Sequence, residues 1–203
     1  MNIHELIELL RSAVTVEDID SKSEEIAELI PNIRVMFGYD QKNQYHCYDL
    51  WMHSLHTVLG IPKDNPDDML FLAALLHDIG KPETQCRSKD PMDPYMHYYG
   101  HPEKSAEIVG QLLPPLIYDF TLESKDAVRR LLYYVRTHDE RMKEDVLRRH
   151  LKEASCREFK NMLLLQIADT KAHILLPLMM ERLNRCNAMM QMADELYGIR
   201  MIR

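Results

Sequence analysis

The sequence predicts an all-α fold, and three features of its composition support this prediction. Leucine, with 27 residues, outnumbers valine (8) and isoleucine (14) combined, a balance that favours helices over sheets. Only 6 glycines and 10 prolines occur among the 203 residues. Hydrophobic residues make up 46% and charged residues 28%, which excludes disordered, collagen-like and fibrous coiled-coil chains. We expect roughly eight or nine helices in a single domain that spans residues 1–203.

The first part of the chain predicts two short helices. Apolar residues recur at helical spacing from residue 3 to residue 10, which predicts the first helix. Ser21 and Glu24 form a capping-box pattern that predicts the start of the second. Pro31 and Asn32 are expected to end it.

The next part of the chain predicts two helices, the second of them strongly apolar. Residues 49–59 are expected to form a helix that Gly60 ends. Asn65-Pro66 begins another helix, which runs through the apolar stretch Met69–Leu76 to Gly80. This stretch of eight residues is the longest unbroken apolar run in the sequence. Because a membrane-spanning helix needs about 20 such residues, we expect none here.

Residues 81–100 interrupt the helical pattern with three prolines and are a candidate lid or binding loop. Pro102 then begins a helix that is expected to end near Pro114. Further helices are predicted at about residues 124–138, 143–154, 157–173 and 178–196. No strand pair, internal repeat or flexible linker is predicted.

Charge and cysteine content narrow the class of protein further. The formal net charge is -7, with 9 basic and 21 acidic residues in residues 1–123 and 16 and 11 in the remainder. Duplex nucleic acid is therefore not an expected partner, although a local anion site remains open. The four cysteines form no C-x-x-C pair, so we expect reduced thiols. Glu5 and Glu8 distinguish the amino terminus from a secretory signal, and we expect a cytoplasmic protein without a membrane partner.

Two aspartates occur where the pattern predicts buried helices. Asp78 follows His77 at the end of the apolar stretch, and Asp169 interrupts the largely apolar segment Met162–Ala168. A buried carboxylate is costly unless it is paired or binds a metal. Two carboxylates that enter the core from separate helices indicate a shared cation. A buried arginine, lysine or helix amino terminus would also satisfy each of them.

Four distinctive segments follow one another in the chain: DLWMHSLHTV (49–58), AALLHDIGKP (73–82), YYGHPEKSAE (98–107) and IADTKA (167–172). In this order they resemble the motifs of the HD-domain metal-dependent phosphohydrolase superfamily. The arrangement is most similar to the HD domain attached to bacterial tRNA nucleotidyltransferases. Asp18-Ile19-Asp20 is similar to a polymerase D-x-D motif, but no Gly-Ser element precedes it. We therefore expect a stand-alone HD domain without the nucleotidyltransferase head.

The resemblance implies a set of metal ligands. Family members bind one divalent metal through a histidine, a His-Asp pair and a distant aspartate, and members with two metals add two histidines. The implied ligands here are His53, His77, Asp78 and Asp169, with His101 and His138 for a second ion and Asp78 as the bridge. We expect one or two divalent transition-metal ions, because imidazole and carboxylate together suit Fe, Mn, Co, Ni or Zn.

Three basic residues are candidates for contact with a phosphate. Lys81 is expected to act in catalysis with Asp78, and Lys104, near a helix amino terminus, and Arg136 are expected to bind substrate. The histidines outside the motifs are expected to have structural roles; they are His4, His46, His97, His150 and His173. The methionine-rich last helix offers a surface for a homodimer.

The implied function is hydrolysis of a phosphate ester by metal-activated water, the ester being a nucleotide, a small phosphomonoester or a cyclic phosphodiester. The loop at residues 82–100 would shape specificity. Two alternatives stay open. The same six ligands resemble those of HD-type di-iron oxygenases, and an HD domain without catalytic activity would bind a nucleotide or a partner protein for signalling.

Overall fold

The computed structural model describes residues 1–117 and 122–201. Helices account for 67% of the structure and strands for 2%, which confirms the predicted all-α fold. The helices of the described residues are α1 (Ile3–Ser12), α2 (Val16–Asp20), α3 (Ser23–Leu29), the 3-10 helix η1 (Pro31–Met36), α4 (Leu50–Leu59), α5 (Asp68–Leu76), α6 (Lys81–Thr84), α7 (His101–Leu112), α8 (Pro114–Ile117), α9 (Leu122–Thr137), α10 (Glu144–Glu153), α11 (Cys156–Lys171) and α12 (Pro177–Met201). The strands are β1 (Cys86–Arg87) and β2 (Met96–His97).

The described residues form more helices than the eight or nine predicted, because α2, α6 and α8 are too short to show apolar periodicity. The capping box predicted at Ser21 and Glu24 is wrong. Ser21 ends α2 in a helical conformation, and α3 begins without a side-chain cap. The capping box of this region lies one helix earlier, where the side chains of Thr15 and Asp18 bond to each other's backbone N–H groups.

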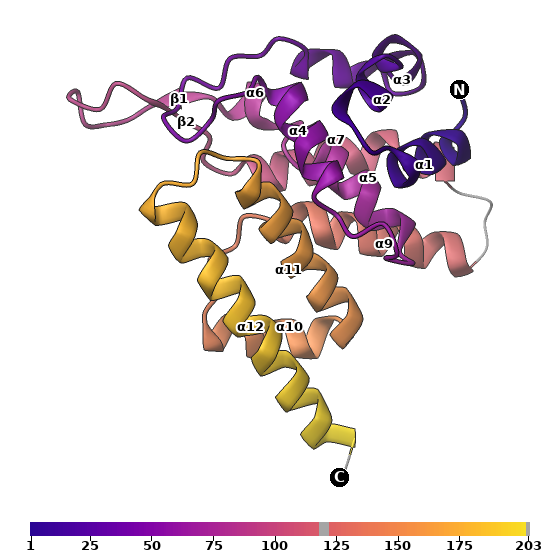
Figure 1. The fold of residues 1–203 in the computed structure, drawn as a ribbon, viewed down its shortest axis with the longest axis vertical. Helices are drawn as coiled ribbons and strands as arrows, with labels where there is room; N and C mark the ends of the chain where they lie inside the picture. Colours follow the sequence, from indigo (N-terminus) through magenta and orange to yellow (C-terminus); the bar gives the residue numbers. More distant parts are fainter. Residues whose placement is uncertain (118–121, 202–203) are drawn as a thin grey trace.

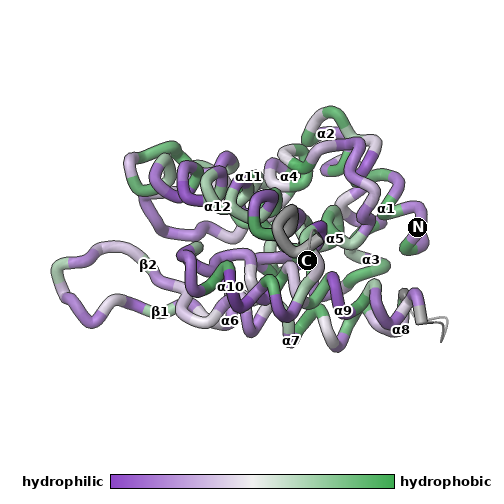
Figure 2. Tube along the Cα trace, turned by 90° about the horizontal axis from the view of Figure 1, so that it is seen from below, coloured by the Kyte–Doolittle hydropathy of each residue, from purple (hydrophilic) through white to green (hydrophobic). Residues whose placement is uncertain are grey.

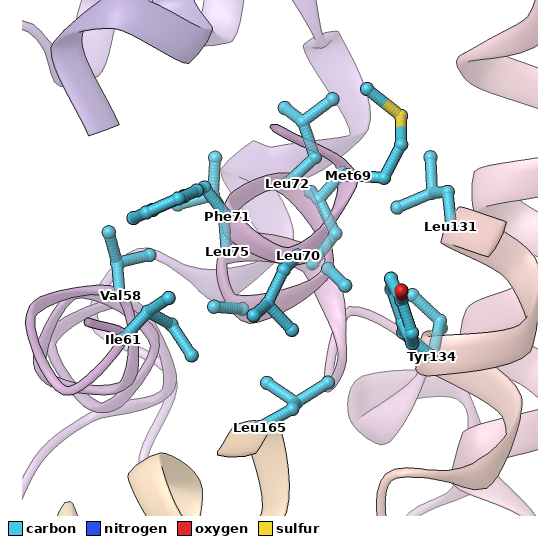
Figure 3. Packing of buried hydrophobic residues seen from close by; sticks show 14 of the residues in the cluster. Val58, Ile61, Met69, Leu70, Phe71, Leu72, Leu75, Leu131, Tyr134 and Leu165 are labelled. Atoms are coloured by element: carbon cyan, nitrogen blue, oxygen red, sulfur yellow. The ribbon is translucent and has the colours of Figure 1, made fainter. Parts of the chain in front are cut away.

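Helix α5 forms the centre of the hydrophobic core. Every residue from Met69 to Leu76 is buried, so this helix is apolar on all sides. It packs against α1, α4, α9 and α11, and Figure 3 shows its side chains pointing in several directions, toward Leu131 on one side and Leu165 on another. A helix buried in this way places the residues after its last turn in the interior. Those residues are His77 and Asp78.

The other helices surround α5 on different sides (Figure 1). Helix α1 packs against α5 and α2 packs against α4, so the amino-terminal helices cover one side of the molecule. Helices α11 and α12 lie side by side on the opposite side. Helix α9 contacts both α5 and α7. Segments from most of the chain therefore pack around α5, either directly or through α4, α9 and α11.

The structure contains a strand pair that the sequence did not predict. Strands β1 and β2 are antiparallel, with Cys86 opposite His97, and the hairpin that they close projects from the helices in both Figure 1 and Figure 2. Two residues per strand are too few to show an alternating pattern. The hairpin is held to the loop before α4, because the Met96 N–H donates to the Lys42 carbonyl (3.0 Å) and Asn43 Nδ2 donates to the Met96 carbonyl (3.3 Å).

The structure can be compared with the expectations for the cysteines and for membrane-spanning helices. All four cysteines are free thiols, as predicted. Within the ranges that the structure describes, no helix combines the length and the apolar character needed to cross a membrane.

The turn after α5 packs closely against the start of α7. Helix α5 ends at Leu76, earlier than predicted, and the turn brings the Gly80 N–H to Ser105 Oγ at 2.9 Å. A Cβ atom on Gly80 would lie 2.5 Å from the Ser105 backbone nitrogen and 2.9 Å from the Lys104 carbonyl carbon. This close approach between two backbones requires glycine.

We expect Gly80→Ala to lower the free energy of unfolding by about 1–3 kcal/mol, because the added methyl group must push α7 away from the turn. Gly110→Ala is the matched control in α7, since its Cβ would meet only the Leu132 side chain, at 3.5 Å. Alanine is the better helix former, so this control should be neutral or up to about 1 kcal/mol more stable. Urea denaturation followed by circular dichroism measures both. Equal stability of Gly80→Ala and the natural protein would contradict the close approach.

Candidate metal centre

The six residues predicted as metal ligands converge at the carboxyl end of α5, and all six are buried. They come from five segments of the chain: His53 from α4, His77 and Asp78 from the turn after α5, His101 from the start of α7, His138 from the turn after α9, and Asp169 from α11. Tertiary packing alone brings these segments together.

The first subset consists of His53, His77, Asp78 and Asp169. His53 Nε2 lies 3.0 Å from Asp169 Oδ1 and 3.6 Å from Asp78 Oδ2. His77 Nε2 lies 3.1 Å from Asp78 Oδ2 and 3.6 Å from Asp169 Oδ1. One ligand atom from each residue lies within 4.8 Å of the others, which is a spacing suited to a single ion.

The second subset consists of Asp78, His101 and His138. Asp78 Oδ1 lies 3.1 Å from His101 Nε2 and 3.4 Å from His138 Nε2, and the two nitrogens are 3.2 Å apart. Asp78 thus belongs to both subsets, with Oδ2 facing His77 and Oδ1 facing His101 and His138. This is the geometry of a bridging carboxylate.

Backbone carbonyls determine which ring nitrogen three of the histidines offer. Nδ1 of His77, His101 and His138 lies 3.0, 2.8 and 2.7 Å from the carbonyl oxygen three residues earlier in each case. A carbonyl oxygen only accepts hydrogen bonds, so each Nδ1 carries a proton. In the neutral ring the lone pair is then on Nε2, which faces the cluster. Metal-binding histidines are commonly held in this way.

Both buried carboxylates are ionised. Burial alone would raise the pKa of Asp78, but His77 and Lys81 hold it well below its ordinary value. Burial opposes ionisation of Asp169 as well, and Arg182 keeps that pKa well below its ordinary value. Lys81 Nζ lies 2.6 Å from Asp78 Oδ2, and Arg182 Nη2 lies 3.0 Å from Asp169 Oδ2. Each carboxylate therefore has a basic partner on one oxygen, and its other oxygen faces imidazole rings.

The histidines differ in their affinity for protons. Burial lowers the pKa of His53 and of His138, which favours neutral rings. Burial also acts to lower the pKa of His77, but the carboxylates of Asp78 and Asp169 outweigh it and raise that pKa to about 10. A proton and a metal ion therefore compete for His77 Nε2, and an ion that binds there releases the proton.

The residues present fit a divalent transition-metal ion. Although other ligand atoms lie 3.1 Å away, no described residue meets hydrogen-bond geometry at the buried atoms His77 Nε2 and Asp78 Oδ1. Carboxylate oxygens and imidazole lone pairs that face one another in a buried site repel unless a proton or a metal ion lies between them. Combined imidazole and carboxylate ligands suit Fe, Mn, Co, Ni or Zn.

A cavity of about 340 Å³ opens beside the cluster. Asp78, Asp169 and Lys81 line it. Lys81 Nζ also donates to Gln41 Oε1 at 2.8 Å, which leaves one of its three N–H groups available. The wall includes aromatic residues: Tyr45, His97, Tyr98 and Tyr99.

The two residues expected to bind substrate lie outside this cavity. Lys104 pairs with Glu83 at 3.2 Å and with Glu107 at 3.1 Å. Arg136 lines a neighbouring cavity of about 490 Å³, which shares Asp139 with the first. The structure does not bring either side chain to the cluster.

Arg182, on α12, contacts the cluster although no sequence pattern indicated it. Its Nη2 lies 3.0 Å from Asp169 Oδ2 and donates to the His138 carbonyl at 3.0 Å. The guanidinium thus connects a carboxylate of the first subset with the backbone of a histidine in the second.

His46 and His173, for which structural roles were expected, line the cavity. His173 follows Asp169 by four residues, which is one helical turn, and this spacing was the signal that could have indicated it. His46 lies in the loop before α4, where the sequence carries no comparable signal.

The segment that carries these residues matches known proteins. Residues 45–175 match the family model described as HD domain. The chain is 32% identical over 85 residues to a multifunctional CCA protein of Nitrosococcus oceani, a match that covers 41% of this chain and 20% of that protein. It is 34% identical over 118 residues to the CC-adding tRNA nucleotidyltransferase of Thermus thermophilus, covering 57% and 25%. It is also 34% identical over 89 residues to the A-adding tRNA nucleotidyltransferase of Deinococcus radiodurans, covering 43% and 20%. The matches thus span only a fifth to a quarter of the length of these relatives.

We expect Arg182→Ala to weaken metal binding by about 10- to 100-fold, because Asp169 loses the group that orients it. Arg185→Ala is the matched control on the same helix, since Arg185 pairs with Glu181. Titration calorimetry with Mn²⁺ measures both affinities. Equal affinities of the two variants would show that Arg182 does not support the cluster.

Proposed function

Because the chain belongs to the HD-domain family, we propose that it is a metal-dependent phosphohydrolase that hydrolyses a phosphate ester. We propose one or two divalent transition-metal ions as its cofactor, with six ligands: His53, His77, Asp78, His101, His138 and Asp169. The convergence of imidazole nitrogens and carboxylate oxygens at a buried point, some of them without a hydrogen-bond partner, is the observation that supports this best.

The charges around the cavity explain why a phosphate would need the ions. The wall carries three carboxylates, on Asp78, Asp139 and Asp169, and two cations, on Lys81 and Arg182. With His77 protonated beside it, this wall has no net positive charge that would attract a phosphate dianion. A divalent ion at the cluster would make the charge that faces the cavity positive.

The side chains have distinct parts in the proposed reaction. When bound, the divalent ions would lower the pKa of a coordinated water and stabilise negative charge on phosphoryl oxygens. Asp78 would link the two subsets, because its Oδ2 faces the first and its Oδ1 faces the second. Lys81, held by Asp78 and Gln41, presents its remaining N–H to a phosphate oxygen in the cavity.

The aromatic part of the wall favours a nucleotide among phosphate esters. Tyr99 stacks on His97, with ring centroids 5.3 Å apart and an interplanar angle of 7°. The Tyr99 side chain is 71% exposed although it lines the cavity, so it is accessible to a ligand. Nucleobases stack on aromatic surfaces of this kind. A nucleotide-containing substrate is also in keeping with relatives named tRNA nucleotidyltransferases.

We further propose that residues 1–203 act as one unit. Helix α12 follows the segment that matches the family model, yet it supplies Arg182 to the cluster. Helix α1 precedes that segment and packs against α5.

The proposal predicts that Asp78→Asn lowers the rate of phosphate release by about 1,000-fold or more, because the substitution removes the charge that both subsets share. Lys81→Ala should lower it by about 100-fold through loss of the phosphate contact. Lys22→Ala removes a lysine that pairs with Glu25 and should leave the rate unchanged. The assay measures inorganic phosphate released from nucleotides and simple phosphomonoesters after chelation and reloading with each metal; for cyclic phosphodiesters, a phosphatase added in excess releases the phosphate of the opened product.

Other results would favour the alternatives. Full activity of Asp78→Asn after removal of metal would contradict a metal-dependent hydrolase. Uptake of oxygen that depends on an added substrate would favour an oxygenase. Tight binding of a nucleotide without turnover under any metal would favour a binding module.

A further inference from the structure

A second histidine group, the histidine trio, lies at the edge of the cavity. His46 and His173 line the cavity, and His53 is buried close to both of them. One ring nitrogen from each lies within 4.8 Å of the other two. The ring centroids are 5.0 Å apart for His46 and His53, 4.3 Å for His46 and His173, and 4.8 Å for His53 and His173. His46 and His173 are absent from both subsets of the metal centre, and His53 is shared with the first.

Two of the trio's ring nitrogens, Nδ1 of His46 and Nδ1 of His53, have no hydrogen-bond partner among the described residues. His53 is fully buried, and its Nδ1 has no hydrogen-bond partner. His46 Nδ1 is likewise buried without one. His173 Nδ1 donates to the Asp169 carbonyl at 2.7 Å, so in the neutral ring its lone pair is on Nε2. If the trio served only as packing, burial of the unpaired nitrogens of His46 and His53 would destabilise the fold without compensation.

The backbone holds the trio together. The Ile174 N–H, next to His173, donates to the carbonyl of Tyr45, next to His46, at 2.8 Å. This bond joins the loop before α4 to the turn after α11. The ring nitrogens of the trio would have to move closer together to bind one ion. His46 lies in a loop and can make this movement more easily than His53, which lies within α4.

We propose that the histidine trio is an additional metal site, selective for Zn²⁺ over Mn²⁺. Three imidazoles with no carboxylate form a ligand set that suits Zn²⁺, Cu²⁺ or Ni²⁺, whereas Mn²⁺ prefers oxygen ligands. A water molecule from the cavity would complete a tetrahedral site. The carboxylates of Asp78 and Asp169 make the main centre suitable for both kinds of ion.

The shared ring of His53 determines the proton balance. When Nε2 binds an ion of the first subset, the proton of the neutral ring is on Nδ1. An additional ion held through His53 Nδ1 would displace that proton to solvent, so His53 could serve both sites only as an imidazolate. Occupancy of the trio does not require that the protein hydrolyse phosphate, so this proposal goes beyond the proposed function.

The test counts metal by elemental analysis after equilibration with either Zn²⁺ or Mn²⁺ and removal of free ion. We expect the natural protein to hold about one equivalent more of Zn²⁺ than of Mn²⁺. His46→Phe and His173→Phe keep a ring in place but remove a ligand, so each should lose this extra equivalent and retain its Mn²⁺. His4→Phe, the same change at an exposed histidine, is the control and should bind both ions as the natural protein does.

Two results would overturn the proposal. The first is an equal count of Zn²⁺ and Mn²⁺ in the natural protein, or an extra Zn²⁺ that both variants retain. The second is loss of Mn²⁺ together with Zn²⁺ from folded variants, which would assign His46 and His173 to the main centre. The count is made without substrate, so a protein that binds the extra Zn²⁺ but hydrolyses no phosphate ester would contradict only the proposed function.

Discussion

The burial of the Asp78 carboxylate at the end of an entirely apolar helix is the constraint on which the rest of the structure depends. A carboxylate in that position is stable only where positive or proton-bearing groups surround it. The chain supplies Lys81 from the next turn, His77 from the same turn, and imidazoles from three other segments. Asp169 enters from α11 and meets Arg182 in the same way. The arrangement of the helices around α5 therefore has to satisfy the buried carboxylates of Asp78 and Asp169 as well as bury apolar side chains.

Much of the centre could be predicted because its strongest signals are local. The run Met69–Leu76 predicts a helix buried on all sides, and the two residues after it must then lie in the interior. Local signals fail where a short pattern fits more than one role. Ser21 matches the start of a capping box, but in the structure it is the residue that ends α2. Spacing alone could not distinguish His53 from His56, its neighbour three residues later on α4, and the family resemblance made that choice.

The rest depends on contacts between distant segments. Arg182 lies in a methionine-rich helix, and only the packing of α12 on α11 directs it to Asp169. His46 reaches the cavity from a loop that the backbone hydrogen bond between Ile174 and Tyr45 joins to the turn after α11. Lys104 shows the converse case. Its position near a helix amino terminus matches a phosphate site, but Glu83 and Glu107 lie close enough to pair with it.

The separation of the clustered residues along the chain has a consequence for folding. His53 and Asp169 are 116 residues apart, so the entropy of closing a long loop must be overcome before both can contact one ion. The cluster therefore cannot nucleate folding, and tight coordination becomes available only after the helices have docked. An ion that binds the docked state alone shifts the folding equilibrium toward it, by an amount set by free ion concentration relative to affinity. Metal supply would then influence resistance to proteolysis and cellular abundance, apart from any effect on chemistry.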